Sequence, residues 1–310
     1  MKKAAFNFKT FVPYMGLLAI IIVFTIGSRG QLLTPNNLLV IFGSMFIYLI
    51  AALGSIFVFS IGALDFSIGS VVGVTATVAA ILAQNTGSLI LCIAAAMAIG
   101  AVTGAIISSL HNIFGLFPFI VSVTIMFAYR GLTWVLNNNG STALPMSMYK
   151  YDNPVFNVIV LVIVFVIILI AFRYTQMGRY AKAVGSNETA ARQSGINTKV
   201  VKLLAFVSSG MFAGLAGVMT LLKAGSSFTT TGQMFECDVL IAMLLGGMPL
   251  SGGSNAKLKA PVIGAVSYAI LSNGLVLCSV PAEIQQGIKG AVLIAIVALS
   301  FDRSGTAVVD

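Results

Sequence analysis

The stretch that decides the fold is 38–83, LLVIFGSMFIYLIAALGSIFVFSIGALDFSIGSVVGVTATVAAILA, in which Asp65 is the only charged residue. As one helix, these 46 residues would extend about 69 Å, more than twice the roughly 30 Å of a bilayer core. The helix must therefore break. We expect the break at Gly62 and Asp65, because glycine is a weak helix former and aspartate prefers caps to helix interiors. Asp65 would then cap a helix that starts at Phe66.

The rest of the chain has the same apolar character. Hydrophobic residues make up 58% of its 310 positions and charged residues 8%, whereas soluble domains carry about 25% charged residues. This composition predicts an all-α, polytopic membrane bundle of about ten helices, some of them broken or half-length. The predicted spans are 11–27, 38–60, 66–83, 88–110, 117–136, 155–172, 200–222, 237–250, 260–280 and 284–301.

The basic residues indicate the topology. Most of the seventeen Lys and Arg residues lie before the first span, after the last one, or in the loops 173–199 and 251–259. Such clustering marks cytoplasmic segments. We therefore expect a multi-pass membrane protein with both termini in the cytoplasm. The loops 137–154 and 223–236 would lie outside. The net charge of +9 then reflects topology, and we predict no nucleic-acid partner.

A second stretch echoes the first. Residues 246–254 (GGMPLSGGS) align with 62–70 (GALDFSIGS), with identities at 62/246, 67/251, 69/253 and 70/254. Paired segments interrupted by glycine or proline point to a transporter's central pathway. The pathway residues predicted from this pairing are Gly62, Asp65, Ser67, Gly69, Ser70, Gly246, Gly247, Ser251, Gly252 and Gly253. Whether Asp65 contacts the solute or only caps a helix stays open at this point.

The loop 173–199 contains a short helix with marked ends. Ser186 is the predicted N-cap, Glu188 suits the positive end of the helix dipole, and Gly195 offers a left-handed stop. Glu188 and Arg192 are spaced as an i,i+4 ion pair. Ala190 and Ala191 would together present a small surface that a docking protein could approach closely. The alternative is an ordinary amphipathic connector.

Four blocks resemble the membrane permease subunit of ribose-type ABC importers, the carbohydrate branch of binding-protein-dependent permeases. They are SIGALDFSIGSVVG (60–73), FPFIVSVTIMFAYRGLTWVL (117–136), GRYAKAVGSNETAARQSGI (178–196) and LLGGMPLSGGS (244–254). The resemblance implies a type II ABC importer-like fold, one transmembrane permease domain over 1–310, and a location in the bacterial cytoplasmic (inner) membrane. It also implies that the third block inserts its short helix into a cytoplasmic ATPase. The residues that would make this contact are Gly185, Ser186, Asn187, Glu188, Ala190, Ala191, Arg192 and Gly195.

The resemblance also implies the partners. They are a cytoplasmic ABC ATPase subunit, an extracytoplasmic solute-binding protein, a second permease copy or paralogue, and the lipid bilayer. ATP and Mg would bind the ATPase, and no cofactor is expected on this chain. The sequence contains no Gly-Lys dipeptide and hence no Walker A phosphate loop. No catalytic or metal-binding constellation is predicted, and the only histidine, His111, is interpreted as a structural or interfacial residue.

The solute stays open. The chain departs from the family's usual pattern at Ala63-Leu64 and at Met248-Pro249. A small neutral polar solute is predicted, such as ribose or another monosaccharide, with autoinducer-2 or nucleosides as alternatives. An ion-coupled secondary transporter is a competing class. It is disfavoured because such proteins often carry several acids inside the membrane, whereas Asp65 is the only acid among the central spans of the N-terminal half. A non-transporting scaffold is a third class.

Overall fold

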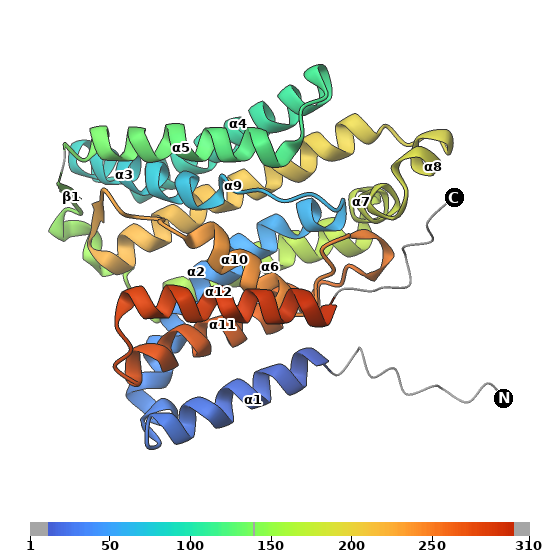
Figure 1. Ribbon diagram of the computed structural model, residues 1–310. Helices are drawn as coiled ribbons and strands as arrows, with labels where there is room; N and C mark the ends of the chain where they lie inside the picture. Colours follow the sequence, from blue (N-terminus) through green and yellow to red (C-terminus); the bar gives the residue numbers. More distant parts are fainter. Residues whose placement is uncertain (1–11, 139, 301–310) are drawn as a thin grey trace.

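The computed structural model describes residues 12–138 and 140–300, and Figure 1 shows a bundle of helices. The basic residues predicted to flank the first and last spans, Lys2, Lys3, Lys9 and Arg303, lie outside the described residues. The bundle consists of α1 (Val12–Gly27), α2 (Pro35–Ser60), α3 (Ile68–Thr86), α4 (Leu89–Phe114), α5 (Pro118–Leu136), α6 (Pro154–Leu169, continued by a π-helical turn Ile170–Tyr174), α9 (Thr198–Ala224), α10 (Phe235–Leu245), α11 (Lys259–Leu277) and α12 (Ala282–Ser300). Two further helices, α7 (Gln176–Ser186) and α8 (Glu188–Gln193), lie between α6 and α9.

Every predicted span contains a helix, which confirms a polytopic α-helical bundle. Among the described residues, seven helices are long and apolar enough to cross a membrane: α2, α3, α4, α5, α6 with its π-helical turn, α9 and α11. The span predicted over 237–250 was wrong, because α10 ends at Leu245. Its 11 residues extend only about 16 Å, roughly half of a bilayer core. Helix α10 is therefore a half-helix.

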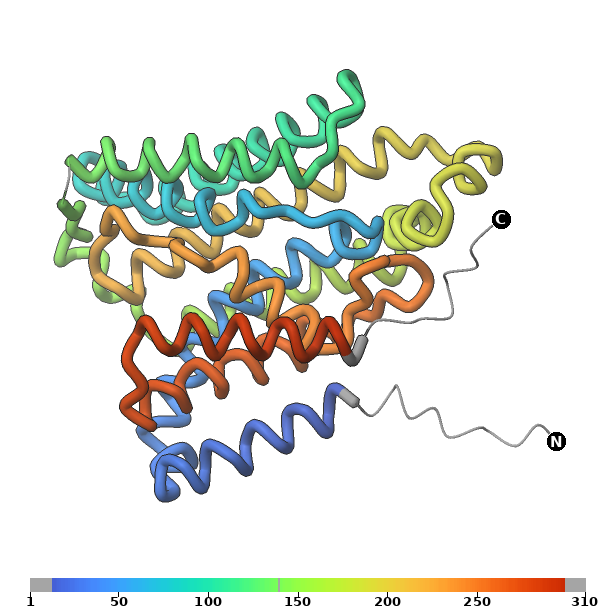
Figure 2. Tube along the Cα trace, viewed as in Figure 1, coloured from blue at the N-terminus to red at the C-terminus, as the bar shows by residue number. Residues whose placement is uncertain are grey.

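The predicted break in 38–83 is confirmed. Helix α2 ends at Ser60, and 61–67 runs back along the bundle without helical coils before α3 begins (Figure 2). The end of α2 is a Schellman motif: Gly62 has φ +74°, its N–H donates to the Phe59 carbonyl (3.1 Å), and the Ala63 N–H donates to the Val58 carbonyl (3.1 Å). The predicted cap was wrong in detail, since α3 begins at Ile68 and not at Phe66.

The second break uses the same motif. Gly247 has φ +83°, its N–H donates to the Leu244 carbonyl (2.9 Å), and the Met248 N–H donates to the Met243 carbonyl (3.0 Å). The structural counterpart of Gly62 is therefore Gly247, one residue beyond the position given by the sequence alignment. The alignment matched identical small residues, whereas the left-handed position after each helix sets the true register.

Helix α9 lies at the centre of the bundle and packs against α2, α3 and α4. Glycines allow the contact with α4. A Cβ on Gly100 would clash with the Gly210 carbonyl, and a Cβ on Gly210 would clash with the Gly100 carbonyl. Small residues spaced four apart thus bring two membrane helices into backbone contact, as expected for packing in lipid. This centre positions the residues of the site around α9.

The two ends of the bundle differ. At one end β1 (Ser141–Ala143) pairs antiparallel with β2 (Ser226–Phe228), with Thr142 opposite Ser227. At the other end lie α7 and α8, the start of α1 and the end of α12 (Figure 1). The loops 137–154 and 223–236, predicted to share one face, therefore meet at one end of the bundle. The short helices Gln31–Leu33, Met146–Tyr151 and Gly253–Asn255 complete the described elements.

Candidate translocation and coupling sites

Helices α7 and α8 form a short module with its own caps. The Thr175 hydroxyl accepts from the Met177 N–H (3.2 Å) at the start of α7. The Asn187 side chain accepts from the Ala190 N–H (2.9 Å) at the start of α8. The N-cap predicted at Ser186 was therefore wrong. Ser186 is still helical, so its hydroxyl donates back to the Lys182 carbonyl (2.9 Å) and accepts from the Ser254 N–H (3.1 Å).

A polar chain fixes α8 to the bundle. The Glu188 carboxylate pairs with the Lys202 ammonium (2.6 Å), not with Arg192 as predicted. Lys202 also donates to His111 Nε2 (2.9 Å), and His111 Nδ1 donates to the Leu116 carbonyl (2.7 Å). Glu188 therefore reaches the start of α9 and the end of α4. Although partial burial acts to raise it, the hydrogen bond and charge of Lys202 hold the pKa of Glu188 below its ordinary value.

The exposed surface of α8 contains one of the two alanines that were predicted to form it. Ala190 and Arg192 are exposed, whereas Ala191 is 5% exposed and belongs to the hydrophobic core. The predicted surface of two adjacent alanines was therefore wrong, because neighbouring residues on a helix point about 100° apart. Gly195 has φ +83° and its N–H donates to the Arg192 carbonyl (3.1 Å), which confirms the left-handed stop.

Both helix breaks contact the end of α7. A Cβ on Gly185 would clash with the Ser60 carbonyl and lie 2.6 Å from the Gly253 nitrogen. A Cβ on Gly62 would lie 2.8 Å from the Ser251 carbonyl oxygen, and one on Gly252 would lie 2.5 Å from the Gly62 nitrogen. We call these four glycines (Gly62, Gly185, Gly252 and Gly253) the glycine junction. Residues predicted for the pathway thus lie directly against the predicted coupling segment.

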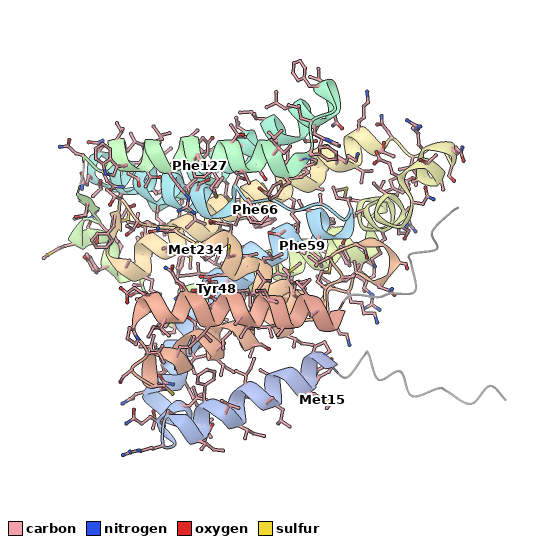
Figure 3. The ribbon with its side chains drawn as sticks, viewed as in Figure 1. Met15, Tyr48, Phe59, Phe66, Phe127 and Met234 are labelled. Carbon is pink, nitrogen blue, oxygen red and sulfur yellow. The ribbon has the colours of Figure 1, made fainter. Side chains whose placement is uncertain are left out.

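Asp65 lies buried between the break and α9. Its Oδ1 accepts from the Ser67 N–H (3.0 Å) and the Ser67 hydroxyl (2.6 Å), and its Oδ2 accepts from the Ser209 hydroxyl (2.8 Å). The carboxylate thus stabilises the turn that leads to Ser67, the N-cap of α3. Through Ser209 it also connects this turn to α9. Phe66, the next residue, lies beside α5 (Figure 3), where its ring contacts Phe119 edge-on at 5.2 Å between centroids.

The remaining predicted pathway residues separate into two places. Gly69 and Ser70 lie at the start of α3, where a Cβ on Gly69 would clash with Glu236 Oε2. Gly246 and Gly247 lie at the far end of α10. There a Cβ on Gly246 would clash with the Ala260 carbonyl, and one on Gly247 would lie 2.6 Å from the Pro13 ring. The predicted set therefore surrounds α10 but does not line one common cavity.

The sequence prediction missed an ionic cluster at the start of α10. Arg130 Nη2 of α5 lies 2.5 Å from Glu236 Oε1, and Lys289 of α12 lies 3.3 Å from Asp238 Oδ1. Glu236 is buried, with 4% of its side chain exposed. Charged residues inside membrane spans are costly and need partners. Arg130 within a predicted span, opposite acids at a span edge, was the sequence signal for this cluster.

A cavity of about 270 Å³ opens beside this cluster. Its walls come from α3, α5 and the segment 229–233 that leads into α10, and they include Ser70, Arg130, Thr133, Trp134, Thr230 and Gln233. Of the predicted pathway residues, Ser70 lines this cavity. By contrast, the space between Asp65 and Glu236 measures about 10 Å³, room for one water at most.

The family described as "Branched-chain amino acid transport system / permease component" matches residues 37–297. The chain belongs to this permease family. It is 30% identical to the ribose import permease protein RbsC of Escherichia coli K12, with 90% of each chain covered. It is 31% identical to RbsC of Bacillus subtilis 168, with 94% of this chain and 92% of the relative covered.

A third relative carries another sugar in its name. The D-allose transport system permease protein AlsC of Escherichia coli K12 is 29% identical, with 96% of this chain and 94% of the relative covered. No solved structure matches the chain. The resemblance deduced from the four sequence blocks is thus confirmed at the level of the family, over nearly the whole length.

Proposed function

We propose that this permease is the membrane subunit of an ATP-driven importer for a monosaccharide. The observation that carries the proposal is the position of α7 and α8. This module lies at one end of the bundle, presents the exposed Ala190, and contacts both helix breaks through the glycine junction. A displacement of α8 would therefore be transmitted through α7 to both helix breaks, without an intervening flexible linker. The sugars in the relatives' names, ribose and allose, support the substrate class.

The basic residues support the orientation in the membrane. Arg179, Lys182, Arg192 and Lys199 lie in or beside α7 and α8. By the positive-inside rule this end faces the cytoplasm, and α1 begins and α12 ends at the same end (Figure 1). The β1–β2 end then faces outward, where an extracytoplasmic binding protein would deliver the sugar. The membrane is the bacterial inner membrane.

The partners follow from this arrangement. A cytoplasmic ATPase subunit, which binds ATP and Mg, would receive α8, and this chain would carry out no hydrolysis itself. A second permease copy or a paralogue would complete the pathway. ATP binding would shift the population between outward-open and inward-open states by favouring one position of α8. Because Gly185 contacts Ser60 and Gly253 at backbone distance, α7 and both breaks would move together.

The competing secondary-transporter class is less well supported. The acids near the membrane centre each have a partner: Asp65 accepts from Ser67 and Ser209, Glu236 pairs with Arg130, and Asp238 pairs with Lys289. A proton carrier built on Glu236 or Asp238 would have to break an ion pair in each cycle. Autoinducer-2 and nucleosides remain the alternative solutes within the importer class.

The coupling role is tested by Ala190→Leu. Ala190 is exposed, so the larger side chain fits this chain but would obstruct a docked ATPase. We expect normal insertion, loss of ATP-driven uptake, and loss of ATPase co-purification. The matched control is Ala94→Leu, an exposed alanine on α4, which should keep both. Wild-type uptake by correctly inserted Ala190→Leu would overturn the coupling role.

The transport class is tested in vesicles that hold the permease, its ATPase and its binding protein. Uptake of radiolabelled D-ribose, D-allose, autoinducer-2 and nucleosides is measured with and without internal ATP. We expect uptake of one of the sugars only with ATP, insensitive to proton and sodium ionophores. Uptake without ATP that ionophores abolish would establish the secondary-transporter class instead. Uptake of a nucleoside alone would replace the substrate.

A further inference from the structure

The 270 Å³ cavity lies toward the β-strand end of the bundle. Trp134 is two residues from the end of α5, and the wall segment 229–233 directly follows β2. On the proposed topology, the cavity is therefore in the outer half of the membrane, on the side from which a binding protein delivers solute. Small-molecule pockets commonly measure about 300–1,000 Å³, so this one suits a single small ring.

The positive charge of Arg130 in the cavity wall is balanced by a neighbouring carboxylate. Arg130 donates through Nη2 to the buried carboxylate of Glu236, which neutralises the guanidinium. An anion would therefore gain little from Arg130. The guanidinium carries five N–H donors, and 29% of the Arg130 side chain is exposed. Arg130 thus combines little net charge with further N–H donors, which suits a neutral ligand.

The other walls present hydroxyls, an amide and one aromatic ring. The buried Ser70 and Thr133 hydroxyls already donate to the Ser67 and Tyr129 carbonyls. By contrast, Thr230 and Gln233 supply exposed groups that both donate and accept hydrogen bonds. Such groups match the hydroxyls of a polyol, which also donate and accept. Trp134, half-exposed on α5, offers the flat apolar surface that the C–H face of a sugar ring requires.

On one side of the cavity, α3 is in backbone contact with the wall segment 229–233. A Cβ on Gly69 would lie 2.5 Å from the Gly232 carbonyl oxygen, and one on Gly73 would lie 2.6 Å from the Thr231 carbonyl oxygen. The pair Gly69 and Gly73 therefore admits the 231–232 backbone against α3. A ligand can therefore pass between α3 and this segment only when the two separate.

We propose that this cavity is an outward-facing binding site for one neutral monosaccharide ring, bounded on one side by the backbone contact between α3 and the segment 229–233. The proposal rests on the proposed function, since that function supplies the sugar and the direction of entry. It adds the residues of recognition: Arg130, Thr230 and Gln233 for the hydroxyls, and Trp134 for the apolar face. None of these was identified as a site from the sequence pattern.

Trp134 makes the test direct, because it is the only tryptophan in the chain. Its fluorescence is recorded for the full chain in nanodiscs during titration with D-ribose, D-allose and D-fructose. We expect a saturable change with at least one of the sugars. Thr230→Ala and Gln233→Ala each remove one hydrogen-bonding group from an exposed position, so folding should survive. Each should weaken binding about twofold to tenfold.

The matched control is Thr124→Ala. Thr124 lies on the same helix α5, is exposed, and uses its hydroxyl on the Ile120 carbonyl (2.9 Å). Binding by this variant should equal that of the wild type. Equal weakening in the control and in Thr230→Ala would overturn the site. Tighter binding of inorganic phosphate than of every sugar would also overturn it, because the site would then be one for anions.

The failure of this inference differs from the failure of the proposed function. One outcome is that Thr230→Ala and Gln233→Ala leave ATP-driven sugar uptake unchanged and that sugars do not change Trp134 fluorescence. This outcome would refute the binding site and leave the importer function standing. Sugar-dependent fluorescence without ATP-driven uptake would keep the binding site and remove the importer. Saturable binding with matching losses of uptake in both variants would support both.

Discussion

Gly185 offers the sharpest test of the glycine junction. In Gly185→Ala the new methyl group would clash with the Ser60 carbonyl oxygen and lie 2.6 Å from the Gly253 nitrogen and 3.0 Å from the Ser60 carbonyl carbon. Van der Waals contact needs about 3.5 Å, so these backbones must separate by roughly 1 Å. All three atoms belong to the main chain of the two breaks, and no side-chain rotation can relieve the clash.

The expected cost follows from two opposing terms. Overpacking of a well-packed site costs about 1–3 kcal/mol, whereas replacing glycine by alanine inside a helix contributes about 0.5–1 kcal/mol. The net loss is about 0–2.5 kcal/mol. At about 2–4 °C per kcal/mol for a large domain, the Tm should fall by up to roughly 10 °C. Sugar uptake should fall further than the loss of folded protein explains, because α7 moves away from both breaks.

The assay is thermal unfolding followed with a thiol-reactive dye. Cys92 is buried and Cys237 and Cys278 are half-buried, so unfolding should expose all three thiols. Gly16→Ala is the matched control. Gly16 also lies inside a helix, but a Cβ there would meet no atom within 4 Å, so its Tm should stay or rise slightly. Equal Tm values for the two variants, both at or above wild type, would refute the close approach at the junction.

Three further predictions follow from the hydrogen bonds and ion pairs. Asp65→Ala should cost more stability than Asp65→Asn, by about 1–3 kcal/mol in denaturant unfolding, because Asn keeps an acceptor for Ser67; equal losses would contradict the turn. Loss of transport in Asp65→Asn with normal folding would show a role beyond this turn. The pKa of Glu188 lies below the ordinary glutamate value of 4.5, so the ion pair with Lys202 should hold α8 fully at a pH above 4.5 and weaken as the pH falls below 4.5. Hydrogen exchange of the α8 amides at pH 7 and pH 4 measures this weakening. Glu188→Gln should remove the difference between the two pH values. Lys202→Met should raise α8 exchange at pH 7 without changing exchange in α5, and unchanged α8 protection would show that Lys202 is not its anchor.

The sequence by itself determined that the chain folds into a bundle of membrane helices, and it located two of the helix ends. The length of 38–83 against the thickness of a bilayer required a break, and glycine placed it at Gly62. The left-handed stop at Gly195 was equally predictable, since both depend on local backbone preferences. Four sequence blocks were enough to indicate the permease family, which the comparisons confirm. These features depend on neighbouring residues and on composition, which a sequence displays directly.

Only the tertiary structure decided which side chains meet. Glu188 forms its ion pair with Lys202 and not with Arg192. Ala191 is buried in the core, whereas Ala190 is exposed. The counterpart of Gly62 proved to be Gly247. Arg130 pairs with Glu236, which lies 106 residues further along the chain. Contacts across such separations depend on how whole helices pack around α9. No local preference encodes that packing, so the cavity beside Arg130 could not be predicted from the sequence.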